Sequence, residues 1–144
     1  MTDNGWSPQG PVRELSDDEV WVRLAQQNLG HLGISIGDQP EIYPVNYLCD
    51  GQTVLFRTAP GEKLRELMIN RRVAFEVDAA IGVGTWSVVI TGRASVVSTE
   101  PELTQQQRDS LPAWIPTQQM LWVRLVPEHV RGRFFEHRLP VGRI

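Results

Sequence analysis

Apolar and polar residues alternate along most of the chain beyond residue 30, and this two-residue period is typical of half-buried β-strands. A turn sequence at residues 37–40 and the dipeptide Asp50-Gly51 separate the first three alternating runs, which therefore form an antiparallel meander. In the fifth run, Gly92 interrupts a series of β-branched residues and predicts a bend or a bulge. The pattern predicts six strands, at residues 31–36, 41–48, 53–58, 72–78, 85–97 and 121–126, the last closed by Pro127.

Three segments have the signals of helices instead. Ser16 and Glu19 have the spacing of a capping box, in which each side chain bonds the backbone amide of the other residue, and an apolar stripe follows them. A short helix is expected over residues 60–68, and a polar surface helix over residues 100–109. Few helices connect one strand to the next. The order of elements therefore favours a mainly β fold, a six-stranded antiparallel barrel with a few short helices.

Length and composition indicate one ordinary globular domain of 144 residues, 41% of them hydrophobic. We expect a flexible arm at residues 1–14, the folded domain at 15–130 and a basic tail at 131–144. A net charge of -3 argues against a nucleic-acid partner, and no apolar run is long enough to predict a membrane helix. The single cysteine, Cys49, cannot form an internal disulfide, and the N-terminus lacks a secretory pattern, so the cytoplasm is the expected location.

The segment from Arg57 to Lys63 carries the strongest signal of a binding site. Arg57 and Thr58 end a predicted strand, a Pro-Gly turn follows, and Lys63 lies in the first turn of the next helix. The first amides of a helix lack intrahelical partners and lie at the positive end of its dipole, so a phosphate could bind them together with both cations. The alternative is that the cations are exposed and pair with Glu62 or Glu66, but the combination of groups favours an anion site.

The predicted strand at residues 41–48 could border a ligand through its backbone. Pro44 cannot donate a ladder hydrogen bond, so one side of the strand is unpaired at that point. Backbone groups near Val45 and Asn46 could therefore meet a flat polar heterocycle. An ordinary edge-strand proline is the alternative interpretation.

Two later strands offer further candidates. Ser87 lies on the opposite face of its strand from Trp86 and Val88, and either face could border a ligand. Trp122 and Arg124 share one face of the last strand, where they could stack on a ligand or form an interface. The sequence contains no nucleophile elbow and no metal-ligating cluster, so an enzyme of this sequence would rely on a cofactor for its chemistry.

Taken in order, these motifs resemble the pyridoxamine 5′-phosphate oxidase-like FMN-binding split-barrel superfamily, in its short actinobacterial-type form. The resemblance covers the chain from about residue 15 to residue 127. It rests on four segments, LGHLG at 29–33, PVNY at 44–47, FRTAPGEKL at 56–64 and WSVVITGRA at 86–94.

The resemblance implies a split barrel that forms a homodimer, with two cofactor sites at the subunit interface. It assigns the FMN phosphate to Arg57, Thr58 and Lys63, and it lays the isoalloxazine ring along the strand that contains Pro44. Trp122 and Arg124 are expected to reach the cofactor from the partner subunit. The complete set of expected cofactor-binding residues is Pro44, Val45, Asn46, Arg57, Thr58, Lys63, Leu64, Trp86, Ser87, Val88, Trp122 and Arg124.

The implied function is that of a flavin-dependent oxidoreductase, which transfers hydride or electrons between FMN and a small organic substrate. The Arg-x-His-type segment of true pyridoxamine phosphate oxidases is not evident, since residues 134–139 have a different pattern, so oxidation of pyridoxamine phosphate itself is not expected. Relatives of this size include deazaflavin-dependent reductases and haem-related proteins. The alternatives are therefore a reductase that uses the deazaflavin F420, or a non-catalytic protein that binds a flavin or haem.

Overall fold

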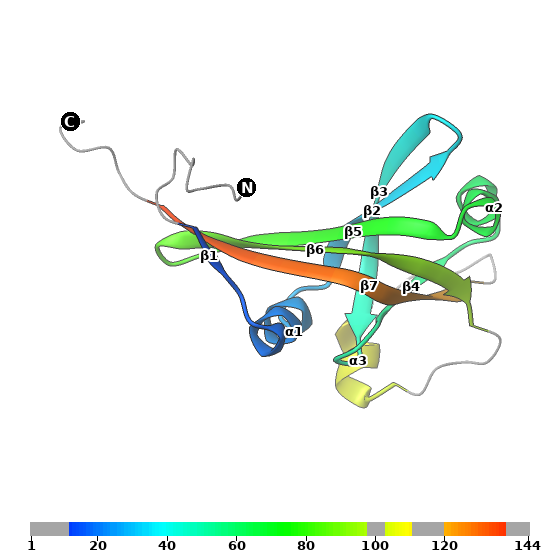
Figure 1. Ribbon diagram of the computed structural model, residues 1–144. Helices are drawn as coiled ribbons and strands as arrows, with labels where there is room; N and C mark the ends of the chain where they lie inside the picture. Colours follow the sequence, from blue (N-terminus) through cyan, green and yellow to red (C-terminus); the bar gives the residue numbers. More distant parts are fainter. Residues whose placement is uncertain (1–11, 98–102, 111–119, 138–144) are drawn as a thin grey trace, which may run out of the picture.

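The computed structural model describes residues 12–97, 103–110 and 120–137. Within these residues, backbone hydrogen bonds join seven strands into one antiparallel sheet, with three short helices around it (Figure 1). In chain order the elements are β1 (Val12–Glu14), α1 (Asp17–Ala25), β2 (Leu29–Ile36), β3 (Gln39–Cys49), β4 (Val54–Thr58), α2 (Glu62–Ile69), β5 (Arg72–Ile81), β6 (Gly84–Val96), α3 (Gln105–Ser110) and β7 (Leu121–Glu136).

Six of these strands close into a barrel. β2, β3, β4, β7, β6 and β5 are paired in that order, and β5 pairs with β2 to complete the ring. The closing ladder is short and runs from His31 to Gly33 on β2. The predicted six-stranded antiparallel barrel is therefore confirmed. β1 lies outside the ring and pairs with the end of β7, so the last residues of the expected arm form a strand; residues 1–11 lie outside the described part of the chain.

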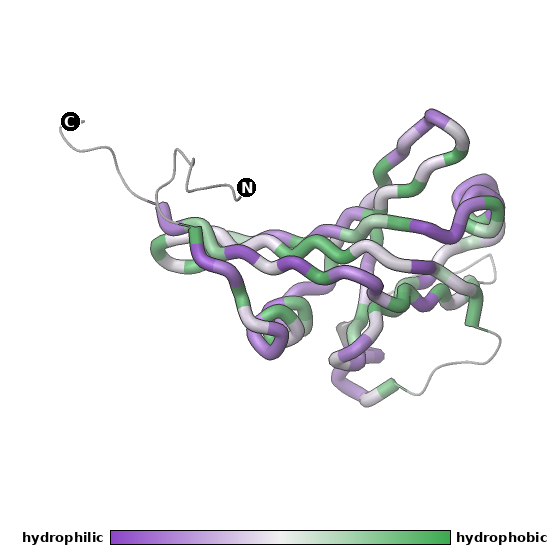
Figure 2. Tube along the Cα trace, viewed as in Figure 1, coloured by the Kyte–Doolittle hydropathy of each residue, from purple (hydrophilic) through white to green (hydrophobic). Residues whose placement is uncertain are grey.

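The barrel interior is filled by the inward-pointing residue of each alternating pair, which gives the banded hydropathy of the strands in Figure 2. The rings of Tyr47 and Phe75 meet edge to face, with centroids 5.1 Å apart. Gly30 lies against this pair, because a Cβ at that position would come within 2.5 Å of the Phe75 ring. The largest fully buried side chains are Trp86, Tyr47, Phe56, Phe75, Leu24 and Leu32.

The first helix is attached to the barrel as its sequence predicts. The capping box is present, because the Glu19 amide donates to the Ser16 hydroxyl and the Ser16 amide donates to the Glu19 carboxylate. Val20 and Leu24 are buried against the core. The Tyr47 hydroxyl donates a 2.6 Å hydrogen bond to the Leu24 carbonyl, which satisfies one of the acceptors at the helix C-terminus.

The last strand is much longer than the sequence pattern suggested. We expected it to end at Pro127, and this was wrong, because β7 continues to Glu136 and contains the first six residues of the expected basic tail. The pairing of β6 with β7 shifts register between Thr91 and Gly92, and Pro127 is paired with Gly92 at that irregularity. A bulge leaves backbone groups out of the ladder, so a proline is tolerated there without ending the strand. The bulge predicted at Gly92 is confirmed.

The remaining helices, α2 and α3, lie outside the barrel (Figure 1). α2 follows β4 and buries Leu67, and the expected short helix over residues 60–68 is thereby confirmed within two residues. α3 begins at Gln105, later than the residue 100 expected, and residues 98–102 lie outside the described part of the chain. Among the described helices, none has the length and apolar character needed to cross a lipid bilayer.

Candidate functional site

The junction between β4 and α2 contains the residues that the sequence singles out for anion binding. Gly61 is the N-cap of α2, and no side chain bonds the amides of the first turn there. A Cβ at Gly61 would meet no atom within 4 Å, so the N-cap position itself is open. The first-turn amides thus point towards a position that a phosphate could occupy.

Arg57 lies on the outer face of the barrel. Its guanidinium carbon is 5.5 Å from the centroid of the Trp122 ring, and the two residues are directly opposite each other on β4 and β7. Trp122 forms a small apolar cluster on this outer face with Leu48 and Leu55, separate from the barrel core. The neighbouring Thr58 points to the other face, where it is buried and its hydroxyl donates to the Ala59 carbonyl at 3.3 Å.

Lys63 packs on a different aromatic ring. Its ammonium lies 4.8 Å from the centroid of the Tyr43 ring, and burial lowers the pKa of Lys63 from its ordinary value. The Tyr43 hydroxyl donates to the carboxylates of Glu41 and Glu66, and the bond to Glu41, with burial, raises the pKa of Tyr43. Lys63 is therefore a partly desolvated cation at the open start of a helix.

The structure brings the three predicted phosphate-binding residues to one strand–helix junction, but their side chains have separate neighbours. Arg57 contacts Trp122, Thr58 contacts its own backbone segment, and Lys63 contacts Tyr43. Their convergence on one phosphate stays a prediction. Leu64, the remaining candidate of this segment, packs against the barrel core.

β3 has the unpaired edge that its proline suggested. β4 pairs with only the last three residues of β3, so within the described residues the edge of β3 that contains Pro44 has no strand partner on the β4 side. Pro44 itself is exposed and lies opposite His31 of β2. Val45 is buried in the barrel core, and the Asn46 side-chain amide donates to the Asn28 carbonyl at 3.1 Å. Only the backbone of this segment is left without a ladder partner on that side.

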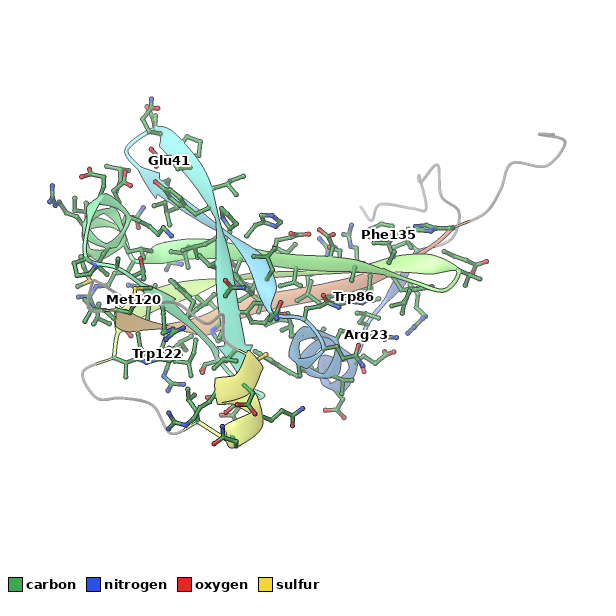
Figure 3. All side chains as sticks on the ribbon, turned by 180° about the vertical axis from the view of Figure 1, so that it is seen from behind. Arg23, Glu41, Trp86, Met120, Trp122 and Phe135 are labelled. Atoms are coloured by element: carbon green, nitrogen blue, oxygen red, sulfur yellow. The ribbon has the colours of Figure 1, made fainter. Side chains whose placement is uncertain are left out.

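The three expected cofactor-binding residues on β6 lie on two different faces of the strand. Trp86 (Figure 3) and Val88 are fully buried inside the barrel, whereas Ser87 points to the outer face, as their alternation predicted. The indole Nε1 of Trp86 is buried without a hydrogen-bond partner among the described residues. Trp86 and Val88 thus contribute to the core, and Ser87 is the member of this group that a surface ligand can reach.

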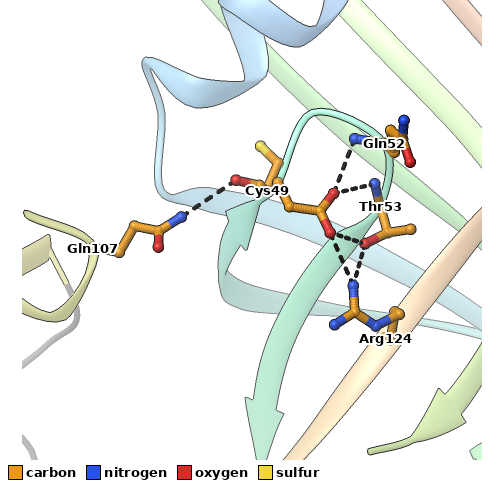
Figure 4. A network of polar contacts seen from close by, with 6 residues as sticks. Cys49, Gln52, Thr53, Gln107 and Arg124 are labelled. Atoms are coloured by element: carbon orange, nitrogen blue, oxygen red, sulfur yellow. Dashed lines mark hydrogen bonds and ion pairs between the residues drawn. The ribbon is translucent and has the colours of Figure 1, made fainter. Parts of the chain in front are cut away.

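Arg124 is held by the hairpin turn between β3 and β4 (Figure 4). Its guanidinium donates to the Asp50 carboxylate at 3.0 Å and to the Thr53 hydroxyl at 2.6 Å. Burial alone would raise the pKa of Asp50, but the amides of Gln52 and Thr53, the Thr53 hydroxyl and Arg124 together hold it below its ordinary value. Arg124 therefore has a role within its own protomer, that of fixing this turn.

The cysteine thiol and possible metal ligands were considered as catalytic groups of the described residues. Burial, with the neighbouring Asp50, raises the pKa of the Cys49 thiol to about 12, so the thiol is protonated at neutral pH. Within residues 12–97, 103–110 and 120–137 no three potential metal ligands cluster together. What the junction offers chemically is therefore binding and orientation of an anionic group.

A second cation-rich surface was missed by the sequence analysis. The outer face of β6 and the far half of β7 form a cavity of about 350 Å³, which we name the β6–β7 trough. The alternating basic residues that line it follow Pro127, and we had ended the strand there. The trough is lined by Ser87, Val89, Thr91, His129, Arg131, Arg133 and Phe135.

The closed six-stranded barrel, with an open helix start beside it, defines this protein as a split barrel with a candidate anion site. The chain belongs to the pyridoxamine 5′-phosphate oxidase family, whose family model matches residues 16–134. The resemblance seen in the sequence is thereby confirmed.

Several individual proteins are similar to this chain. The FAD binding protein from Mycobacterium smegmatis is 35% identical, with a TM-score of 0.72, and the match covers 88% of this chain and 100% of that one. A FAD-binding protein from Mesorhizobium loti is 26% identical, with a TM-score of 0.68, over 86% of this chain and 96% of that one. An uncharacterized protein of Mycobacterium tuberculosis is 38% identical over 88 residues, which are 61% of this chain and 80% of that protein.

Proposed function

We propose that this protein binds a flavin, with FMN as the cofactor, and that it acts as a flavin-dependent oxidoreductase on a small organic substrate. The observation that carries the proposal is the β4–α2 junction, where open space and uncapped amides at Gly61 adjoin the partly desolvated Lys63. A cation that loses hydration gains most from an anionic partner. The similarity to two proteins named for FAD binding supports a flavin as the source of that anion.

The residues present fit a phosphorylated flavin. The first-turn amides of α2, Lys63 and Arg57 supply donors and positive charge for the phosphate, and the Thr58 hydroxyl lies at the same strand end. The free edge of β3 around Pro44 offers backbone groups to the polar rim of the ring. A bound flavin supplies hydride or electron transfer, and the protein positions it and excludes water.

We also propose that the protein works as a homodimer with its cofactor site at the subunit interface. The outer face of the barrel exposes apolar side chains, which include Val89 and Val126. Trp122 already contacts Arg57 within one protomer, so a partner subunit at this face would cover the phosphate site from outside.

The second candidate function is non-catalytic binding of a flavin or of haem, or use of the deazaflavin F420 in place of FMN. The groups that meet at the junction bind and orient an anion, and this is all that non-catalytic binding requires. Separate titrations of purified protein with FMN, FAD, F420 and haem distinguish the ligands. Bleaching of the bound flavin by NADH or NADPH, followed by turnover with an acceptor, distinguishes an enzyme from a binding protein.

Substitution of both cations tests the phosphate site. We expect Arg57→Ala/Lys63→Ala to weaken FMN binding at least about 100-fold, because each charge-assisted hydrogen bond contributes about 1.5–3 kcal/mol. The matched control is Arg65→Ala, which removes an exposed arginine paired with Glu62 from the same helix. Equal FMN affinity in the double variant and the wild-type protein, measured by quenching of flavin fluorescence, would contradict the assignment.

A further inference from the structure

A cavity of about 430 Å³, which we name the α1–α3 cavity, lies at the end of β3 away from α2 (Figure 1). It is bounded by residues 25–28 at the C-terminus of α1, by residues 47–49 of β3, and by Thr104, Gln106 and Gln107 around the start of α3. Its volume lies within the range of small-molecule sites, roughly 300–1,000 Å³. The described lining shares no residue with the expected cofactor-binding set.

The described lining of the α1–α3 cavity contains no charged side chain, and half of its residues are glutamine or asparagine. It differs in this from the β4–α2 junction, where Lys63 lies at the helix start. Two arginines next to the cavity already have partners, because Arg23 donates to the Gln26 side-chain oxygen at 3.4 Å and Arg124 is paired with Asp50. An anion placed in the cavity would lose hydration without gaining an opposite charge.

The walls of the cavity are held in place by hydrogen bonds. At the start of α3, the Gln107 backbone amide donates to the Thr104 hydroxyl, and the Thr104 amide donates to the Gln107 side-chain oxygen, both at 3.0 Å. The Gln107 side-chain nitrogen donates to the Cys49 carbonyl at 3.4 Å, which ties α3 to the end of β3 (Figure 4). On the other wall, the Tyr47 amide donates to the Asn28 carbonyl at 3.0 Å. The cavity is therefore formed before any ligand binds.

Three amide side chains of the lining have no hydrogen-bond partner among the described residues, those of Gln27, Asn28 and Gln106. Each amide has an oxygen that accepts and an NH₂ group that donates. The last carbonyls of α1, at the negative end of the helix dipole, add acceptors on the same side. A ligand that donates and accepts through adjacent atoms, as a carboxamide does, matches this lining.

The floor of the cavity is uncharged and partly apolar. Tyr47 and Leu48 are buried there, between the two helices. Burial, with the neighbouring Asp50, keeps the pKa of the Cys49 thiol well above neutral, so the thiol adds no charge. A small ring placed on this floor removes apolar surface from water.

From this combination we infer that the α1–α3 cavity binds a neutral carboxamide or lactam carried on a small ring. Gln27, Asn28 and Gln106 exchange hydrogen bonds with the amide of the ligand, and the ring contacts Leu48. The inference goes beyond the proposed flavin function, because it uses none of the groups at the β4–α2 junction. Tyr43, the neighbour of Lys63, is roughly 20 Å from Cys49 along β3.

Three probes of nearly the same shape test the inference. We expect nicotinamide to bind. We expect 3-acetylpyridine, in which a methyl group replaces the NH₂ group, to bind at least about fivefold more weakly, because it lacks the donor. Nicotinate is expected to bind at least about tenfold more weakly, because its carboxylate is charged and meets no cation. Binding is followed by calorimetry and by backbone amide NMR shifts, which are expected at residues 25–28, 47–49 and 104–107.

Variants then locate the binding. Gln27→Ala/Gln106→Ala is expected to weaken nicotinamide about tenfold, in line with the loss of two neutral hydrogen bonds. The matched control is Gln105→Ala, which removes a glutamine of the same helix that is bonded to Asp109 and does not line the cavity. Thermal unfolding checks that each variant is folded.

A change of charge at the same position gives an independent test. In Gln106→Lys a cation adjoins the cavity, so nicotinate is expected to bind more tightly than nicotinamide, the reverse of the wild-type order. An unchanged order of the two probes in this variant would show that they bind elsewhere and would overturn the inference.

The flavin-site variant separates this inference from the proposed function. Arg57→Ala/Lys63→Ala is expected to leave nicotinamide affinity unchanged, whether or not FMN binding is lost. Nicotinamide binding that requires bound FMN and disappears in that variant would place the ligand at the flavin and overturn the inference. The inference also fails if wild-type protein does not bind nicotinamide, if it binds nicotinate equally well, or if Gln27→Ala/Gln106→Ala and Gln105→Ala have the same affinity.

Discussion

The two halves of β7 carry cations in different surroundings. Before the bulge, Arg124 donates to Asp50 and Thr53, and the Trp122 ring contacts the guanidinium of Arg57 on the neighbouring β4. Each of these cations therefore has a partner within the protein. Beyond the bulge, Arg131 lies above a floor of hydroxyls and Val89, and the described lining of the trough includes no carboxylate. Arg124 therefore stabilises a turn of its own protomer, whereas Arg131 adjoins a neutral, partly apolar floor.

The bulge at Gly92 separates the two halves of β7. Substitution of Gly92 is expected to change the stability of the protein more than the other variants do. In Gly92→Ala, the new Cβ would lie 2.1 Å from the Val126 carbonyl oxygen, so the backbone of β7 would have to move. We expect a loss of about 3 kcal/mol in the free energy of unfolding, at the upper end for overpacking in a well-packed structure. Urea denaturation measures it.

A matched control is available in another strand. In Gly33→Ala, the new Cβ would lie 3.6 Å from the Ala74 Cβ, which is an ordinary contact. This variant is expected to change stability by less than about 1 kcal/mol. If both variants unfold at the same urea concentration, the close approach at Gly92 does not determine the path of β7.

The bulge also shows what the sequence could and could not provide. The alternation of residues predicted all six barrel strands, and Gly92 itself indicated the irregularity. Pro127 was nevertheless taken as a strand end, because a proline normally cannot be accommodated in a central ladder. Only the pairing of Pro127 with Gly92 at a register shift shows that the ladder continues past it.

The candidate site was predictable to the extent that it depends on local sequence. The start of α2 and the positions of Arg57 and Lys63 beside it follow from neighbouring residues, and the structure has them there. The contacts of Lys63 with Tyr43 and of Arg124 with Asp50 join residues far apart in the chain. Such contacts depend on barrel closure, which no local pattern encodes.

Removal of Arg124 is expected to have an intermediate effect and tests the half of β7 before the bulge. Arg124→Ala breaks the bonds to Asp50 and Thr53, and we expect it to cost about 1–2 kcal/mol, since a hydrogen bond between charged groups is stronger than a neutral one. Chemical denaturation measures the loss. FMN affinity is expected to change less than about threefold, because this side chain is held by its own hairpin turn.

The outcome that would contradict this interpretation of Arg124 is a stable variant with weakened FMN binding. Asp50→Asn serves as the companion variant, because it keeps the shape of the turn but removes the charge that Arg124 faces. If Arg124 acts on the turn alone, the two variants lose similar amounts of stability and both retain the cofactor. A cofactor effect confined to Arg124→Ala would assign that residue to the site of the partner subunit.

The smallest expected effect concerns Glu76 of β5, which lies opposite Val89 of β6. Burial, and then the neighbouring Asp78, raise the pKa of Glu76 from near 4.5 to about 7, whereas His31, 3.3 Å away, lowers it. The folded protein therefore binds a proton at Glu76 more tightly than the unfolded chain does. The resulting stabilisation is complete below pH 4.5 and is lost as the pH rises through 7.

Glu76→Gln removes this dependence. Its melting temperature is expected to equal that of the wild-type protein near pH 4.5 and to exceed it by about 3 °C at pH 8, which corresponds to roughly 1 kcal/mol after allowance for partial exposure. In a background with Asp78→Asn, the difference in melting temperature that Glu76→Gln makes at pH 8 is expected to be smaller, because the like charge next to Glu76 is gone. A Glu76→Gln variant that melts below the wild-type protein at pH 8 would show instead that the ion pair with His31 outweighs burial, and that Glu76 is stabilised by its own partner just as Arg124 is.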